Sequence, residues 1–228
     1  MPKSSAAPRL AGYSALVLLL NTICCGAANF PAPSGKFTFE GKPYVGTPII
    51  TNAVITSNSL YFTGKYNWLP DLFWPLVFNY QQFSIVVKLR PENISYATLL
   101  VGGTGHRWLV VNTDKDGRVK LSFNNHQFRH AVDSLIITNG QWTTLALTFD
   151  LQARKTVVYA NGKQAEAIVL PEAFVLDVMN DEKWRESDKV LTFTDGATGG
   201  TFRGLVAGLL TFNSVLSPNQ VRLLFPNK

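Results

Sequence analysis

Short runs of apolar and β-branched residues recur along the chain, with glycine, proline, asparagine or aspartate between them. The clearest example is 141–164, where two such runs flank a short polar turn and Asn161-Gly162 follows as a tight reversal. Runs of this kind predict strands at 37–40, 49–55, 59–63, 83–89, 98–101, 108–112, 118–124, 134–138, 143–149, 156–160, 190–193 and 205–212. Only the C-terminal residues show a helical period, so we expect one short helix that begins at Ser217-Pro218.

This series of elements predicts an all-β fold. Many short strands separated by turns form a sandwich or a barrel. A parallel α/β sheet is excluded, because parallel strands need crossover helices and the pattern offers none. We therefore expect a two-sheet antiparallel sandwich with a short C-terminal helix, built as one domain.

The N-terminus has the pattern of a signal peptide. Lys3 and Arg9 supply positive charge, residues 15–20 form an apolar centre, and Gly26-Ala27-Ala28 is a small-residue cleavage site. The apolar segment is too short and too mixed for a membrane span. We expect a signal peptide at 1–28, an extended lead-in at 29–36, a folded domain at 37–228, and a secreted or periplasmic product.

Charge and cysteine content narrow the picture further. Removal of Lys3 and Arg9 leaves 19 of the 21 basic residues against 15 acidic ones, a net charge of +4. The basic residues are scattered, so nothing beyond the sign of the charge supports nucleic-acid binding. Both cysteines, Cys24 and Cys25, lie in the predicted leader. Lipid attachment there is an alternative, but the preceding Ile23 is not the small residue that such a site prefers.

Four blocks, in a fixed order, carry a family resemblance. They are SLYFTGK at 59–65, FSIVVKLRP at 83–91, QWTTLALTFD at 141–150 with NGK at 161–163, and FRGLVAGLLTFNSVLS at 202–217. Together they resemble the laminin-G-like jelly roll of the concanavalin A-like lectin/glucanase superfamily, over about 55–226. The resemblance implies a jelly-roll sandwich. It does not select a function, because this sandwich hosts lectins, hydrolases, adhesion modules and spacers.

The resemblance also implies where a glycosidase site would lie. Hydrolases of this fold use Glu-x-Asp-x-x-Glu, or a version one residue longer, with the outer glutamates as nucleophile and acid/base. The nearest match begins at Glu186 and Asp188, but Leu191 or Thr192 stands where the second glutamate is needed. Without that acid no group protonates the leaving oxygen. We therefore expect no catalytic residues and no enzyme activity.

Two short segments contain side chains of the kinds that bind metal ions. His126 and His130 would share one side of a strand, but zinc needs further ligands and Asp133 is the only carboxylate close in sequence. We interpret the histidines as polar surface residues. Asp114-Lys-Asp116-Gly resembles a calcium loop without its final glutamate, and a hairpin turn is the simpler interpretation. We expect no metal ligand and no cofactor, with calcium as an open alternative.

The segment 66–80 is unusually aromatic for a connection between two strands. Trp68 and Trp74 offer faces on which sugar rings stack, and Asn67 and Asp71 can hold hydroxyls. The alternative is that this loop plugs one end of the sandwich. The next candidate contacts are Trp184, among charged residues, and the segment 124–130. Trp108 and Trp142 are interpreted as core residues.

These observations favour a secreted, non-catalytic, lectin-like domain that binds carbohydrate or another extracellular ligand. One alternative is a degenerate or atypical glycoside hydrolase or lyase. The other is a structural or adhesion module that binds a protein partner. No nucleic-acid partner and no membrane span are expected.

Overall fold

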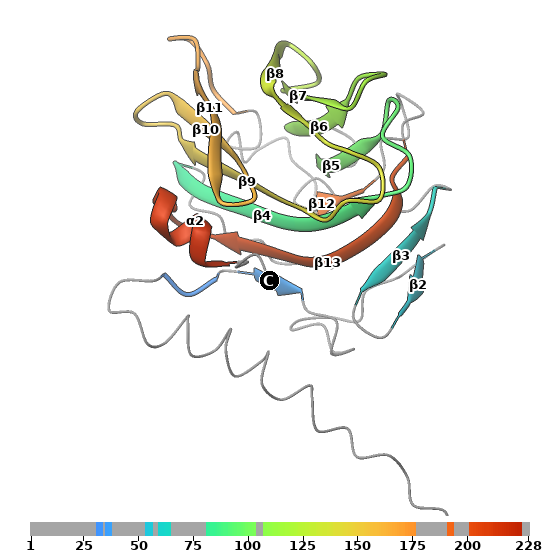
Figure 1. The fold of residues 1–228 in the computed structure, drawn as a ribbon. Helices are drawn as coiled ribbons and strands as arrows, with labels where there is room; N and C mark the ends of the chain where they lie inside the picture. The colour runs from blue at the N-terminus through green and yellow to red at the C-terminus, as the bar shows by residue number, and fades with distance from the viewer. Residues whose placement is uncertain are drawn as a thin grey trace, which may run out of the picture. The chain divides into compact units, whose positions relative to one another are not determined.

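The structure is a computed structural model that describes residues 31–33, 35–37, 53–56, 59–64, 81–103, 107–176, 191–193 and 201–224. Its strands form two antiparallel sheets (Figure 1). The larger sheet has the order β11-β10-β9-β4-β13-β3-β2, with β1 paired to β13, and the smaller has the order β12-β5-β6-β7-β8. The predicted two-sheet antiparallel sandwich with a short C-terminal helix is confirmed.

The elements have the following bounds. The strands are β1 Gly35–Phe37, β2 Ala53–Ile55, β3 Leu60–Thr63, β4 Gln82–Pro91, β5 Thr98–Gly102, β6 Leu109–Thr113, β7 Arg118–Phe123, β8 Phe128–Ile136, β9 Thr143–Asp150, β10 Lys155–Ala160, β11 Lys163–Val169, β12 Leu191–Thr192 and β13 Arg203–Phe212, and the helix is α2 Pro218–Leu224. In the described part of the chain, no helix is long and apolar enough to cross a membrane.

Alternate residues of the central strands fill the space between the sheets. Phe83 on β4 stacks on Phe149 of β9 with ring centroids 4.3 Å apart, and the indole of Trp108 meets Phe83 edge-on at 6.0 Å. All three side chains are buried. Gly102 makes room for the indole, since a Cβ there would lie 2.3 Å from its Cε2. Trp108 is thus the core residue that the sequence predicts.

The turn between β6 and β7 is the predicted hairpin. Asp114 Oδ1 accepts hydrogen bonds from the backbone N–H groups of Asp116 (2.9 Å) and Arg118 (3.1 Å). Gly117 has φ +86°, and a Cβ there would lie 2.4 Å from the carbonyl oxygen of Ile137. The Asp-Lys-Asp-Gly sequence therefore serves the backbone geometry of a turn.

The chain that follows β13 covers the part of the larger sheet's outer face around Ser84. Ser84 Oγ donates a hydrogen bond to the carbonyl of Ser214 (2.7 Å) and accepts one from the N–H of Leu216 (3.0 Å). In α2, Val221 and Leu224 are buried. Phe212, which pairs with Ser84 on the same face, is also buried. Figure 1 shows α2 in red beside β4 and β13.

Trp142 is not in the core, so its predicted burial is wrong. Its side chain is 38% exposed and lies just before β9, which begins at Thr143. Side chains alternate between the two faces of a strand. Leu145, Leu147 and Phe149 point inward and are buried as predicted, whereas Trp142 belongs to the opposite set. The cations of Lys88 and Arg90 lie 5.8 and 5.5 Å from its ring centroid.

Two edge strands differ from the prediction. The strand β8 spans Phe128–Ile136, earlier and longer than the expected 134–138, and β11 at Lys163–Val169 was not expected. Both are largely exposed, and charged or polar residues interrupt their apolar ones, so they lack the clear apolar runs that predict strands. Backbone pairing of β8 with β7 and of β11 with β10 stabilises these strands, although their local β-propensity is weak.

Candidate functional site

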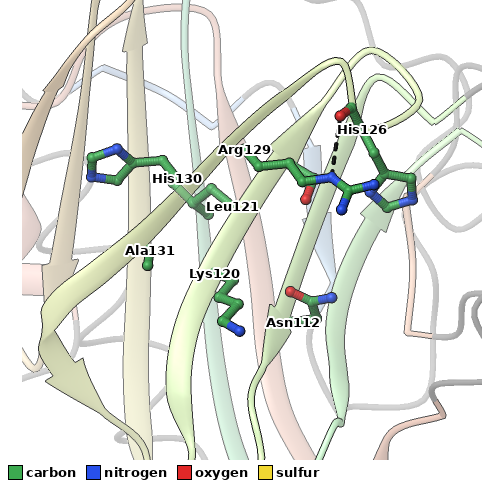
Figure 2. Close-up of a pocket in the computed structure, with 8 residues that line it drawn as sticks. Asn112, Lys120, Leu121, His126, Arg129, His130 and Ala131 are labelled. Atoms are coloured by element: carbon green, nitrogen blue, oxygen red, sulfur yellow. Dashed lines mark hydrogen bonds between the residues drawn. The ribbon is translucent and has the colours of Figure 1, made fainter.

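A hollow of about 470 Å³ lies on the outer face of the smaller sheet (Figure 2). Three consecutive strands, β6, β7 and β8, build it because each pairs antiparallel with the next. The register sets Asn112 opposite Lys120, Lys120 opposite Ala131, and Ser122 opposite Arg129. Its described lining residues are Asn112, Lys120, Leu121, Ser122, His126, Arg129, His130 and Ala131.

The polar lining residues of β6 and β7 face outward because their neighbours along each strand are needed in the core. On β7, Val119, Leu121 and Phe123 are fully buried between the sheets. Lys120 and Ser122 alternate with them and therefore project from the opposite face. The same alternation in β6 sends Val111 inward and Asn112 outward. The apolar pattern that makes the core thus also makes a polar row on the other side of the sheet.

A turn of unusual backbone shape closes one end of the hollow. Asn124, Asn125 and His126 have positive φ values of 49°, 53° and 70°. Asparagine tolerates this left-handed conformation better than most residues. The side chain of Asn124 holds the turn in place by donating from Nδ2 to the carbonyl of Val175 (2.6 Å), and Asn125 Oδ1 accepts from the N–H of Arg107 (3.0 Å). His126 is thereby fixed at the rim.

Two cationic side chains, Lys120 and Arg129, line the hollow and keep N–H groups that can donate to a ligand. Arg129 is exposed, and its Nε donates a hydrogen bond to the carbonyl of His126 (3.2 Å; dashed in Figure 2). Lys120 is also exposed, and its Nζ lies 3.9 Å from Asp114 Oδ2. A partly exposed pair at that distance contributes little to stability. Both side chains can therefore turn to a ligand at small cost.

Asp114, in the turn between β6 and β7, is the carboxylate beside Lys120. Desolvation acts to raise its pKa, but the hydrogen bonds from the Asp116 and Arg118 amides, with the charges of Lys120 and Arg118, hold the pKa below its usual value. Asp114 therefore stays ionised as a backbone acceptor of the turn. A second carboxylate, Asp133, pairs with Arg118: its Oδ1 accepts a hydrogen bond from Arg118 Nη1 at 2.9 Å.

The hollow also contains an acceptor that has no partner among the described residues. Asn112 Oδ1 is buried and makes no hydrogen bond. A buried polar atom left in this state costs about 1–3 kcal/mol. A donor brought by a ligand would recover that cost.

The two histidines do not converge, contrary to the alternation expected for them. His126 belongs to the turn and precedes β8, so the rule for strand positions does not apply to it. His130 lies on β8 and points away from Arg129 (Figure 2). Its Nε2 lies 2.6 Å from Glu166 Oε1 on β11, which links the edges of the two sheets. Among the described residues, no three His, Cys, Asp or Glu side chains are grouped to hold a metal ion.

The residues that the sequence singled out for ligand binding lie outside the described residues. These are Asn67, Trp68, Asp71, Trp74 and Trp184. The carboxylates Glu186 and Asp188 also lie outside them, but Leu191 is described: it is buried in β12, opposite Gly102. Thr192, the alternative position, is buried as well.

Of the ligand contacts predicted from the sequence, only the segment 124–130 lies in the hollow, where it contributes His126, Arg129 and His130. It missed Asn112, Lys120 and Ser122. A usable signal was present, because polar residues alternate with apolar ones along 118–123. That signal becomes a site only when β6, β7 and β8 are placed side by side.

A family model described as the concanavalin A-like lectin/glucanases superfamily matches residues 63–222. No curated protein matches the chain. Among solved structures, a Trypanosoma rangeli sialidase in complex with the inhibitor DANA is similar, with a TM-score of 0.63 and 14% identity over 95% of this chain. The match spans only 39% of that sialidase.

A second similar structure is domain 4 of AbnA, a GH43 extracellular arabinanase from Geobacillus stearothermophilus, in complex with arabinotriose. Its TM-score is 0.54 and its identity 21%, and the match covers 87% of this chain and 90% of that domain. At these identities the likenesses establish a shared fold.

Proposed function

The chain belongs to the concanavalin A-like lectin/glucanases superfamily, and from this premise we propose that it is a secreted, non-catalytic, lectin-like domain that binds carbohydrate in the hollow of the smaller sheet. The observation that carries the proposal is the convergence of Asn112, Lys120, Ser122 and Arg129 on one open face. Sugar recognition needs several hydrogen-bonding groups fixed in a concave surface. A hollow of about 470 Å³ is within the range of small-ligand sites.

The rigidity of the site supports binding. The backbone positions of Asn112, Lys120 and Ser122 are fixed before a ligand arrives, because each lies next to a buried core residue of β6 or β7. Preorganised groups lose little entropy on binding. Domain 4 of the arabinanase AbnA, which has a similar fold and was solved in complex with arabinotriose, supports carbohydrate as the ligand class.

The absence of catalysis rests on the carboxylates. Glycosidases of most families place two carboxyl groups across the scissile bond. None of the described residues that line the hollow is acidic. Leu191 and Thr192, the positions where a second glutamate would complete the motif, are buried in β12. Mutation of either to glutamate would bury a charge and not furnish an acid in a cleft.

The test is a binding measurement on the mature protein with a glycan array, followed by titration calorimetry on the best hit. Arg129→Ala and Ser122→Ala are expected to weaken binding at least about tenfold, which corresponds to the loss of one good hydrogen bond or charge contact. Lys163→Ala is the matched control, because Lys163 is equally exposed but lies on β11. Unchanged affinity in Arg129→Ala and Ser122→Ala would remove the hollow as the site.

The aromatic segment 66–80 is the competing location for the same function. If Trp68→Ala/Trp74→Ala weakens binding at least tenfold while the melting transition is preserved, the site belongs there. Turnover of a β-glucan that Glu186→Gln abolishes would establish the hydrolase alternative. Failure to bind any glycan, with a protein partner captured instead, would establish the adhesion alternative.

Export is a separate part of the proposal. The basic residues Lys3 and Arg9, the apolar centre and the small residues at 26–28 support cleavage by a signal peptidase. N-terminal sequencing of the exported protein is expected to begin near Asn29. A mature chain that starts with a lipid-modified Cys24 or Cys25 would contradict this prediction.

A further inference from the structure

The hollow has a one-sided charge. Lys120 and Arg129 are exposed and positive, and its described lining includes no carboxylate. Toward the described residues Arg129 donates only from Nε, so the edge formed by its two terminal nitrogens can make a bidentate contact. A planar guanidinium matches a carboxylate or a sulfate group better than it matches a neutral hydroxyl.

The acids outside the hollow do not cancel these charges. Asp114 accepts two backbone hydrogen bonds in its own turn and lies 3.9 Å from Lys120. Asp133 is engaged with Arg118. Arg129 has no carboxylate within ion-pair distance in the described part of the chain. The field of the hollow is therefore positive, with Arg129 as its least compensated charge.

The described lining also includes no tryptophan, tyrosine or phenylalanine; its only rings are the imidazoles of His126 and His130. Neutral sugars depend heavily on the stacking of their C–H faces on tryptophan or tyrosine. Here the described lining offers the donors and acceptors of Asn112, Lys120, Ser122 and Arg129 with only Leu121 and Ala131 as apolar surface. Charge and hydrogen bonding, and not stacking, are left to supply the affinity.

The buried acceptor in the hollow selects a saccharide over a simple anion. Asn112 Oδ1 has no hydrogen-bond partner. A fully deprotonated inorganic anion such as sulfate brings no donor to it. A sugar that carries both an acidic group and free hydroxyls can satisfy the cations and this acceptor together.

We propose that the hollow recognises an anionic saccharide, with the acidic group of the sugar on Arg129 and Lys120 and a sugar hydroxyl donating to Asn112. This inference rests on the proposed carbohydrate-binding function and adds the class of sugar. Carboxylated and sulfated sugars share the required chemistry. The test below distinguishes them.

The probes are glycans that differ only in charge. We would titrate the protein with a trimer of galacturonic acid, the same trimer as its methyl ester, a sulfated galactose oligosaccharide and its desulfated form. The charged member of each pair is expected to bind at least about tenfold more tightly, the usual effect of one charge-assisted contact. Raising the salt from 50 to 500 mM is expected to weaken only the charged members, because salt screens exposed charges.

Substitutions in the hollow test the contacts. Arg129→Gln and Lys120→Gln are each expected to erase most of the preference for the charged member, and Lys120→Arg is expected to keep it. Lys163→Gln removes an equal charge from β11 and is expected to change nothing. Asn112→Leu is expected to weaken charged and neutral probes alike, since its contact is to a hydroxyl. Circular dichroism and melting curves verify that each variant is folded.

The outcomes distinguish a failure of the anionic preference from a failure of carbohydrate binding itself. Equal or tighter binding of the neutral members would overturn the anionic inference and leave carbohydrate binding intact. Binding of no glycan at all would overturn both. Equal affinity for polyphosphate, or a preference for charge that survives in Arg129→Gln and Lys120→Gln, would also overturn the inference. A bias toward the galacturonate or the sulfated probe would identify which acidic group the site prefers.

Discussion

The two sheets of the sandwich use their outer faces differently. On the larger sheet, Ser84 holds the chain that follows β13, and Phe212 beside it is buried. On the smaller sheet, Ser122 occupies an equivalent outward position on a central strand but lines a hollow. Both serines are nearly inaccessible, at 0% and 5% exposure. The first has protein partners on its hydroxyl, and the second faces the space beside Arg129.

This difference separates stability from binding. The covered face adds apolar burial and satisfied hydrogen bonds to the fold. The open face keeps its polar groups for something outside the protein. The same residue type therefore has opposite expected consequences on the two faces, which makes the comparison testable by substitution.

The largest effect is expected for the core that both sheets share. Phe149→Ala removes a ring that stacks on Phe83 and also contacts Phe123, and it is expected to lower the free energy of unfolding by about 3–5 kcal/mol. Ile136→Ala, at an exposed position of β8, is expected to change it by under ~0.5 kcal/mol. Denaturant titration measures both. Similar losses in the two variants would mean that the core is not where these contacts place it.

The next effect tests the covered face directly. Ser84→Ala leaves the N–H of Leu216 and the carbonyl of Ser214 without their partner and is expected to cost about 1–3 kcal/mol. Ser122→Ala is expected to cost less than Ser84→Ala, because its hydroxyl makes no hydrogen bond to the described residues that would be lost, while it weakens glycan binding. Thermal unfolding and calorimetry on both variants provide the comparison. A stability loss in Ser122→Ala equal to that in Ser84→Ala would erase the distinction between the faces.

A smaller effect is expected at Trp142. Because this side chain is 38% exposed, Trp142→Ala is expected to destabilise the protein by roughly 1 kcal/mol, well below the cost of a buried ring. Part of that loss reflects its contacts with Lys88 and Arg90, which are worth about 0.5–1 kcal/mol at exposed sites. Chemical denaturation gives the value. A loss as large as that of Phe149→Ala would show that Trp142 is an additional core residue.

The smallest effect concerns the hairpin beside the hollow. The pKa of Asp114 is lowered in the folded protein, so its contribution to stability is present above the unfolded value of about 3.8 and is lost as the pH falls through the lower, folded value. Asp114→Asn is expected to remove this acid-dependent part of the stability curve. Melting temperatures between pH 2 and 6 measure it. Parallel curves for the two proteins would mean that Asp114 does not titrate differently in the folded state.

The central strands were predictable because they are both apolar and local. The runs at 83–89, 118–124 and 143–149 coincide closely with β4, β7 and β9. Burial on one or both faces imposes alternation or continuous apolar runs, and both are visible without a structure. The turn at Asp114–Gly117 and the reversal at Asn161-Gly162 were also predictable, because each depends on the conformational preferences of its own residues.

Local sequence patterns failed to predict the edge strands and the exposure of Trp142. The strand β11 is polar, and its pairing with β10 comes from the reversal and the neighbouring strand. For Trp142, residue type favoured burial, but strand parity placed the indole outside. Its aromatic character carried no information about which face the residue would occupy.

The sequence by itself determined the all-β sandwich, its central strands, its hairpin turns and its short C-terminal helix, because those features follow from the order of apolar and polar residues along the chain. Only the tertiary structure decided which outer face would be covered and which would stay open. It also brought Asn112, Lys120 and Arg129 together from three strands. Such a site depends on register between strands, and register is a property of pairing in space that no single segment encodes.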